Sequence, residues 1–311
     1  MRKTFLVSTR APAFLIAVVS LASISVVSQA QTAVTKTWTP PRTPWGDPDL
    51  QGIWNNSTTT PLERPSQFAG KEVLTDEEVA NLNERNTNRG KSIGRTSLIV
   101  DPPDGRIPLT AEAQKKRAAG AEYRRAHPAD SWEDLPLYTR CIVRGGLPNL
   151  PTRVNNNYQI LQTPGYVVIL QEIMHDTRIV PLDGRPHLGR NISQWSGDSR
   201  GRWEGNTLVV DTTNFSPKID PTVTRFRGSG ETFHLVERFT RIDANNIDYR
   251  FTIEDPKSFT RPWTAMLPMR KTQDPIYEYA CHEGNYPMVN ILRGYRADEK
   301  AAEEAAKKGL R

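Results

Sequence analysis

Apolar and polar residues alternate in the C-terminal half of the chain. Residues 247–254 read IDYRFTIE, so that Ile247, Tyr249, Phe251 and Ile253 are each followed by a polar or charged residue. A period of two residues is typical of a β-strand with one buried side and one solvent-facing side. We therefore predict a strand here, with the apolar residues on its buried side.

Further β-forming runs begin at about Asn157. The runs YQILQT and YVVILQE flank the turn dipeptide Pro164-Gly165, and DTRIVPL, RWEGNTLVVDTTNF, HLVERFTRI, WTAMLPM and IYEYAC complete the set. Short turns join antiparallel strands, whereas parallel strands need crossover helices. We therefore predict a mainly β fold, in which about eight strands within residues 151–296 form an antiparallel β-barrel-like or two-layer sheet.

The segment from residue 31 to about residue 70 has a different character. Proline recurs every few residues, which disfavours regular structure, and Trp38, Trp45 and Trp54 are spaced along the segment. We interpret it as an extended, Pro/Trp-rich arm that lays aromatic side chains on the rest of the molecule. The arm and two helices after it make up residues 31–150, which we expect to pack on the sheet.

The first of these helices is predicted to begin at Thr75 and to end at about Asn88, because Thr75 can cap it and acidic residues fill its first turn. The second begins at Thr110 and ends before Pro128, and its charge density indicates a largely solvated helix. A polar helical tail at 297–311 contains the Glu/Lys pairs of another solvated helix.

Residues 1–30 have the composition of a secretory signal peptide. A basic start precedes an uncharged, mostly apolar run at 11–27, and Ser28-Gln29-Ala30 offers small residues to a signal peptidase. The alternative is an uncleaved membrane anchor, although the run is slightly short for a span. Because Ala and Ser also dilute the run, we predict cleavage. No later segment approaches the length of a span, so we predict no membrane span afterwards and a periplasmic or secreted location.

The chain contains two cysteines, Cys141 and Cys281. An exported protein meets an oxidising compartment, and an even number of cysteines permits one bridge. We expect a disulfide between them, with two unpaired buried thiols as the alternative. A bridge across such a long loop contributes about 4–5 kcal/mol in the chain-entropy description.

Charge and motifs argue against several functional classes. The formal net charge is +6 with both signs mixed along the chain, and there is no basic stripe with interleaved aromatic residues, so no nucleic-acid partner is predicted. There is no phosphate-binding glycine loop between a strand and a helix and no βαβ alternation, so no nucleotide cofactor is predicted.

Two segments of the sequence contain side chains that could bind a metal. His175, Asp183 and His187 offer metal-ligating side chains, but twelve residues around a turn separate the two histidines and the spacing is not that of a tight site. The sequence Cys281-His282-Glu283 offers another set, which a disulfide at Cys281 removes. We therefore predict neither a metal nor an organic cofactor.

Gly197-Asp198-Ser199-Arg200-Gly201 matches G-x-S-x-G, the nucleophile elbow of serine hydrolases. A working elbow places the serine between a strand and a helix. The residues that follow Ser199 favour a turn and then a strand, so we predict a glycine-rich loop that leads into a β-hairpin.

Charged residues occur within several of the β-forming runs. Glu172, Arg178, Asp211, Glu237, Arg238 and Arg250 either occupy the solvent-facing side of the sheet or line the inside of a closed barrel. An eight-stranded barrel is just wide enough for one small ligand. Trp195, Trp203 and Trp263 are candidates for aromatic walls of such a pocket, with a place in the core as the alternative.

The stretch GDSRGRWEGNTLVVDTTNF, together with VVILQE, RIVPLDGRPH, HLVERFTRID, EDPKSFTRPWT and YEYACHEGNY, resembles a widespread, uncharacterised family of exported bacterial proteins with a GDSxGRWEGxTLVVDTxxF-type motif. The segment GDPDLQGIWNNSTTTPLERP is also similar to that family, so the resemblance covers most of the chain after residue 30. It implies secretion and a single evolutionary unit, and it carries no catalytic assignment.

Two functions are compared. The first is an exported barrel-like protein that binds a small, partly aromatic or apolar molecule, for which the candidate binding residues are Arg178, Trp195, Trp203, Arg238, Arg250 and Trp263. The second is a cofactor-independent periplasmic hydrolase, lyase or isomerase with acid–base chemistry, for which the candidates are Glu172, His175, Asp183, His234 and Glu237. A third hypothesis is an envelope-interaction protein that makes contact through exposed tryptophans of the arm. The sequence does not specify the oligomeric state.

Overall fold

A computed structural model describes residues 38–85, 90–144, 147–219 and 232–309. The predicted signal peptide at 1–30 and the first residues of the arm lie outside the described residues.

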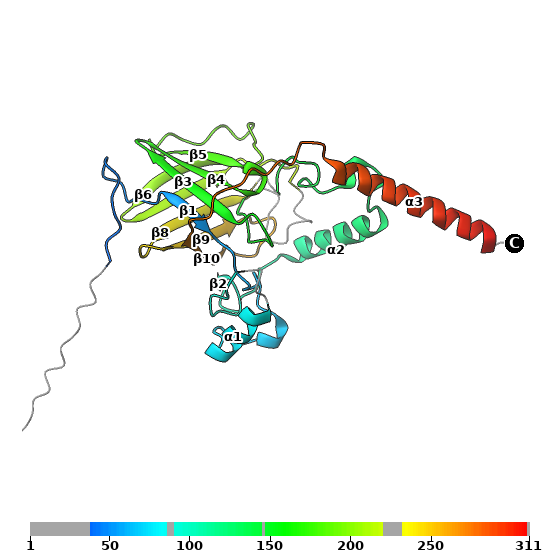
Figure 1. Ribbon diagram of the computed structural model, residues 1–311, viewed down its shortest axis with the longest axis horizontal. Coiled ribbons are helices and arrows are strands. Elements are labelled where there is room, and N and C mark those ends of the chain that lie inside the picture. The colour runs from blue at the N-terminus through cyan, green and yellow to red at the C-terminus, as the bar shows by residue number, and fades with distance from the viewer. Residues whose placement is uncertain (1–37, 86–89, 145–146, 220–231, 310–311) are drawn as a thin grey trace, which may run out of the picture. The chain divides into compact units, whose positions relative to one another are not determined.

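The described chain is mainly β (Figure 1). Ten strands form one antiparallel sheet in the order β5-β4-β3-β1-β10-β9-β8-β7-β6, and β2 pairs with β10 beside this path. The strands are β1 (Gly52–Asn55), β2 (Ile99–Asp101), β3 (Asn157–Thr163), β4 (Tyr166–Gln171), β5 (Thr177–Pro181), β6 (Asp198–Glu204), β7 (Thr207–Thr213), β8 (His234–Arg241), β9 (Asn246–Glu254) and β10 (Trp263–Lys271). The sheet curls into a nearly closed, barrel-like form, which confirms the predicted fold class.

The two ends of the strand order, β5 and β6, come close together at Gly201. A Cβ atom at Gly201 would lie 2.5 Å from Leu182 Cδ2 and 2.8 Å from Val180 Cγ1. Real Cβ atoms do not approach other atoms this closely. The absent side chain of Gly201 therefore lets β6 approach β5. The second glycine of the G-x-S-x-G match therefore serves the closure of the sheet.

The inner side of the sheet is a packed hydrophobic core. Ile247, Tyr249, Phe251 and Ile253 of β9 are at most 4% exposed, as the alternation in the sequence predicted. Phe251 packs edge-on against Trp263 at a centroid distance of 5.8 Å, and Trp263 itself is fully buried. Side chains thus fill the inside of the sheet, which we had considered from the sequence as a ligand pocket.

A buried ion pair crosses this core. Arg178 of β5 and Glu237 of β8 meet through two hydrogen bonds of 2.5 and 3.1 Å, and their side chains are 5% and 1% exposed. Tyr249 donates a hydrogen bond of 2.8 Å to the same carboxylate. Burial, followed by the charge of Glu237, raises the pKa of Tyr249 well above its ordinary value, so its hydroxyl keeps the proton that it donates.

Among the described residues, three α-helices lie outside the sheet: α1 (Asp76–Arg85), α2 (Ala111–Ala126) and α3 (Tyr286–Gly309), with short 3-10 turns η1 (Ser66–Phe68), η2 (Trp132–Asp134) and η3 (Ile173–His175). Both helices predicted before the sheet are present. Thr110 caps α2 by accepting a hydrogen bond from Ala113 N at 3.1 Å. The helical tail is confirmed, but α3 begins at Tyr286 rather than at residue 297.

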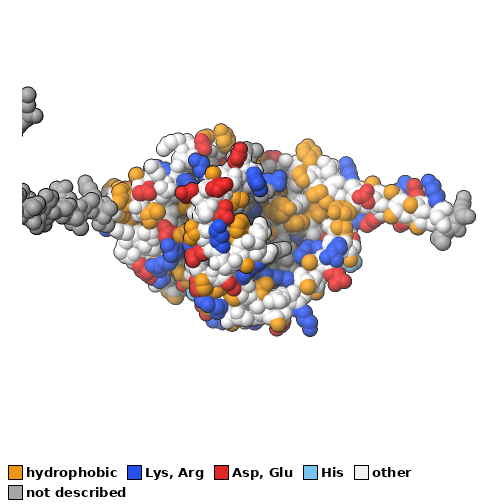
Figure 2. Space-filling view, turned by 90° about the horizontal axis from the view of Figure 1, so that it is seen from below, with side chains coloured by type: hydrophobic (Ala, Val, Ile, Leu, Met, Phe, Trp, Pro, Cys, Tyr) orange, Lys and Arg blue, Asp and Glu red, His pale blue; other side chains and the backbone are white. Residues whose placement is uncertain are grey.

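A disulfide joins Cys141 to Cys281, as the sequence predicted. Next to it, Asn285 donates to Thr139 O at 2.9 Å, and Arg296 of α3 donates to Ala129 O at 2.6 Å. The disulfide and these hydrogen bonds therefore join residues 129–141 to residues 281–296, which include the start of α3. Apolar side chains gather beside this helix on the face shown in Figure 2.

Three elements differ from the sequence expectations. IYEYAC forms no strand, because residues 276–281 run irregularly toward the disulfide. The proline-rich arm, expected to lack regular structure, supplies β1, whose Trp54 lies opposite both Tyr158 of β3 and Lys271 of β10. The short strand β2 was also missed. In the described part of the chain, no helix is long and apolar enough to cross a membrane.

The ion pair in the core gives a stability prediction. Glu237→Gln keeps the volume of the side chain and an acceptor for Tyr249, but it leaves the buried charge of Arg178 without a counter-ion. We expect a loss of about 3–5 kcal/mol in the free energy of unfolding, measured by denaturant titration.

The matched control is the double variant Arg178→Met/Glu237→Gln, which removes both charges. We expect it to recover most of the lost stability, since replacing a whole buried pair costs less than breaking it. If the double variant loses as much stability as Arg178→Met and Glu237→Gln lose together when made singly, the two residues are not energetically coupled.

Candidate functional site

A cleft of about 990 Å³ opens at one end of β7, β8 and β9. The loop that connects β5 to β6 forms one wall, and the ends of the three strands form the other. His187, Asn214, Phe215, Phe233, His234 and Glu254 are among the residues that line it. Because Leu235 and Glu237 of β8 point into the core, His234 lies on the opposite, outer side of the sheet.

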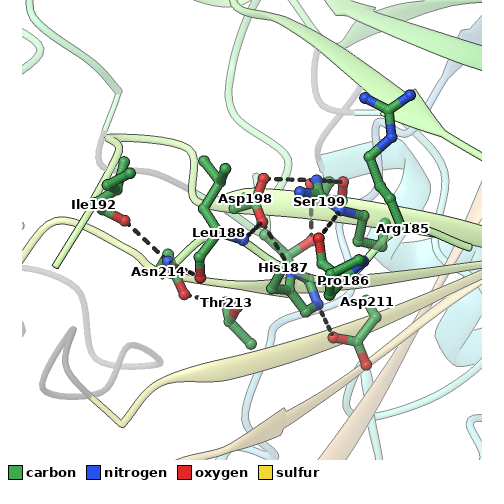
Figure 3. A network of polar contacts seen from close by, with 12 residues as sticks. Arg185, Pro186, His187, Leu188, Ile192, Asp198, Ser199, Asp211, Thr213 and Asn214 are labelled. Atoms are coloured by element: carbon green, nitrogen blue, oxygen red, sulfur yellow. Dashed lines mark hydrogen bonds and ion pairs between the residues drawn. The ribbon is translucent and has the colours of Figure 1, made fainter. Parts of the chain in front are cut away.

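Asn214 holds the loop in place (Figure 3). Its backbone has a φ of 56°, and its Nδ2 lies 3.1, 3.0 and 2.9 Å from the carbonyl oxygens of Leu188, Gly189 and Ile192. Gln194 N also donates to Asn214 O at 2.9 Å. A left-handed asparagine just after β7 thus folds the loop back over the outer side of the sheet.

Carboxylates and imidazoles alternate in a row of hydrogen-bonded residues, of which His187 and His234 line the cleft. His187 Nδ1 lies 3.0 Å from Asp198 Oδ2, and His187 Nε2 lies 2.9 Å from Asp211 Oδ1. The second oxygen of Asp211 lies 2.9 Å from His234 Nε2. The result is a continuous chain, Asp198–His187–Asp211–His234, most of which is drawn in Figure 3. We call it the carboxylate–imidazole chain.

The chain fixes the hydrogen-bonding role of His187. Carboxylates accept hydrogen bonds and cannot donate them when ionised, so His187 makes both contacts only when both ring nitrogens carry a proton. Asp198 is also held by Leu188 N at 2.9 Å and by Arg200 at 2.6 Å. His187 therefore has no ring nitrogen left for a ligand.

The chain also shifts the acidities of its members. Burial acts to raise the pKa of Asp198, but hydrogen bonds from Leu188 N, His187 and Arg200 outweigh it and lower this pKa. Burial likewise opposes the hydrogen bonds and charges of His234 and His187 at Asp211, whose pKa is lowered overall. The hydrogen bond to Asp211 raises the pKa of His234 against its partial burial.

His234 is the member of the chain that remains available to a ligand. Its Nε2 is occupied by Asp211, but its Nδ1 lies 3.7 Å from Glu254 Oε2, beyond the length of a normal hydrogen bond. An imidazole that is oriented by a carboxylate and has one accessible nitrogen can donate a proton, accept one, or bind an anion.

The remaining walls combine apolar and charged groups. Phe215 and Phe233 meet edge to face with their centroids 4.9 Å apart, and they form an apolar side of the cleft together with Leu188. Arg190 and Lys257 add positive charge to the lining, whereas Glu254 adds negative charge. Among the described residues, no group of three or more His, Cys, Asp or Glu side chains is placed to hold a metal ion.

The five catalytic candidates do not converge on one cavity. His234 lines the cleft, whereas Glu237 is in the core. Glu172 is buried and accepts a hydrogen bond from Asn157 N at 3.1 Å, His175 Nδ1 lies 3.1 Å from Tyr279 O, and Asp183 pairs with Arg185 on the surface. Their catalytic roles stay predictions.

The six binding candidates are similarly dispersed, and none of them lines the cleft. Arg178 and Trp263 are buried in the core, against which Trp203 packs. Arg238 pairs with Glu204 at 2.8 Å and Arg250 pairs with Asp248 at 2.9 Å, both on the outer side, while Trp195 is half-buried in the loop before β6. Their assignment to a pocket therefore stays a prediction.

The elbow hypothesis and the arm hypothesis can be judged from geometry. Ser199 is a buried residue of β6 whose Oγ lies 3.0 Å from Thr212 Oγ1, and the segment that follows is strand, as predicted, not helix. The motif itself lies in the strand rather than in a preceding loop. In the arm, Trp54 is fully buried and Trp38 lies over Arg241, so the three tryptophans do not form one exposed patch.

The roles of four residues were not predicted from the sequence: His187, Asp198, Asp211 and Asn214. Asp211 and His234 both belong to the outer side of their strands, but only the register between β7 and β8 shows that they are neighbours. Comparison with protein-family models and with curated proteins found no match to this chain. The interpretation of the site therefore rests on its geometry.

The Asp211–His234 contact gives a pH prediction. A histidine whose pKa is raised on folding stabilises the protein fully at low pH, and this stabilisation is lost as the pH rises through the raised value. Asp211→Asn should return the pKa of His234 toward its ordinary 6.5. NMR titration of the imidazole from about pH 5 to about pH 9 checks this, and the stability difference from the wild type should shrink toward the alkaline end.

Glu254→Gln is the matched control, because Glu254 is a weaker cause of the same shift and lies farther from the ring. We expect it to lower the pKa of His234 less than Asp211→Asn does. An unchanged titration of His234 in the Asp211→Asn variant would show that this contact does not set its acidity.

Proposed function

We propose that this protein is exported and binds a small, partly aromatic or apolar molecule in the cleft at the end of β7, β8 and β9. The observation that carries the proposal is the cleft itself, with phenylalanines on one side and an oriented imidazole on the other. A volume of about 990 Å³ falls at the upper end of the range for small-molecule sites. The disulfide and the barrel-like fold support an exported protein with a periplasmic or secreted location.

The packing of the core favours the outer cleft over the barrel interior as the binding place. Trp263 and Phe251 fill the inside of the sheet, and Glu237 is already bound by Arg178 and Tyr249. A ligand there would have to displace these groups and break a buried ion pair, at a cost of several kcal/mol. At the cleft, a ligand covers exposed lining residues such as Leu188, Arg190 and Lys257, while Phe215 and Phe233 are already mostly buried.

We also infer membership of the family of exported bacterial proteins that the GDSxGRWEGxTLVVDTxxF-type motif suggests. Three residues of this motif have specific structural tasks here, which supports the inference. Asp198 holds His187, Gly201 permits the approach of β6 to β5, and Asp211 joins the two imidazoles.

The second candidate function is a cofactor-independent enzyme with acid–base chemistry. It is favoured by the Asp211–His234 contact, because a carboxylate that orients an imidazole is the usual arrangement for proton transfer by histidine. A bound compound that is chemically changed on incubation, with the change lost in His234→Gln, would favour the enzyme. A compound recovered intact would favour the binding protein.

Obstruction of the cleft tests the binding function. Ser193 is an exposed residue of the cleft lining, so Ser193→Trp should occupy ligand space without disturbing the core. Aromatic compounds found in a thermal-shift screen should bind this variant at least about tenfold more weakly than the wild type, a loss of about 1.4 kcal/mol.

Ala301→Trp provides the control, because it adds an equally exposed indole on α3, away from the cleft. Affinity should be unchanged in this variant. If Ser193→Trp binds the screened compounds as tightly as the wild type does, the cleft is not their binding place.

A further inference from the structure

The cleft presents an oriented hydrogen-bond donor next to an apolar wall. His234 Nδ1 is the only ring nitrogen of the carboxylate–imidazole chain, among its described contacts, that lacks a partner within hydrogen-bond distance. Its ring cannot turn away freely, because Asp211 holds Nε2 at 2.9 Å. The donor is therefore fixed in direction before any ligand arrives, which reduces the entropy that binding must overcome.

The charge of this donor follows from its neighbours. Asp211 favours the imidazolium form of His234, and Glu254 adds to this effect from 3.7 Å. His187 faces the same Asp211 carboxylate from the other side, while Lys257 and Arg190 are the cationic residues of the lining. Asp211, which two imidazoles engage, is not part of the lining, and Glu254 is the one carboxylate among the described lining residues.

These features select the chemistry of the ligand. A protonated Nδ1 donates its strongest hydrogen bonds to anionic oxygen. The lining also contains Leu188, which is 40% exposed, and the mostly buried edge-to-face pair of Phe215 and Phe233, so that a flat apolar ligand meets apolar groups within the same cleft. Relying on the binding function proposed above, we propose that the cleft takes an aromatic compound with an anionic oxygen group, such as a carboxylate, sulfonate or phosphate, and that His234 Nδ1 binds this group.

A pair of fluorescent probes tests the proposal on the purified protein. Anilinonaphthalenesulfonate and N-phenylnaphthylamine share the same aromatic body, but only the first carries an anionic group. At about pH 6, where His234 is charged, we expect the sulfonate to bind at least about tenfold more tightly than the neutral probe. This preference should decline as the pH rises and His234 loses its proton.

Two variants assign the preference to one residue. His234→Gln should remove both the preference for the anionic probe and its pH dependence. His127→Gln should change neither, because His127 follows α2, outside the cleft, and pairs there with Asp130. A preference that survives in His234→Gln would overturn the proposal.

The Ser193→Trp variant separates this proposal from the proposed function. If both probes bind equally and both are weakened by Ser193→Trp, the cleft binds small molecules but does not select anions, and the present inference fails alone. If neither probe is affected by Ser193→Trp, the cleft is not the binding place and both proposals fail. If Ser193→Trp weakens the binding of the sulfonate, and the neutral probe binds the wild type only poorly, both proposals are supported.

Discussion

The ion pair between Arg178 and Glu237 is the constraint around which the rest of this structure is arranged. It joins β5, at one end of the strand order, to β8, near the other end, through the inside of the sheet. Ionised groups in an apolar core are tolerated when they pair with each other, and here two hydrogen bonds join the pair while the Tyr249 hydroxyl donates a third to the carboxylate. An open sheet would hold β5 and β8 apart in the strand order, so the two charges meet only when the sheet is curled.

A sealed interior determines where binding chemistry can be placed. With the inside of the sheet filled by aromatic side chains and the ion pair, the reactive groups gather on the outer side, under the loop between β5 and β6. That loop depends on a single asparagine at the end of β7 and on a histidine held between two carboxylates. The cleft therefore has one wall made of the ends of three strands and another made of the loop that these contacts hold in place.

Local patterns predicted the strands well and the site poorly, for physical reasons. The alternation at 247–254 and the cap at Thr110 depend on neighbouring residues, and both appear as expected. The strand β1 was missed because proline and tryptophan dominate its surroundings, although its pairing with β3 and β10 outweighs local preference. The contact of Asp211 with His187 and His234 depends on strand register and on the fold of a loop, and a local sequence pattern predicts neither of these.

The position of β1 has a consequence for how the chain reaches its native state. Trp54 of this strand lies opposite Lys271, which follows it only after most of the other strands. The gap between β3 and β10 can be filled only when both distant partners exist, so contacts far apart in sequence must form before the sheet is continuous. Contacts between segments that lie far apart in the sequence form more slowly than local contacts, so we expect this pairing to limit how fast the sheet is completed.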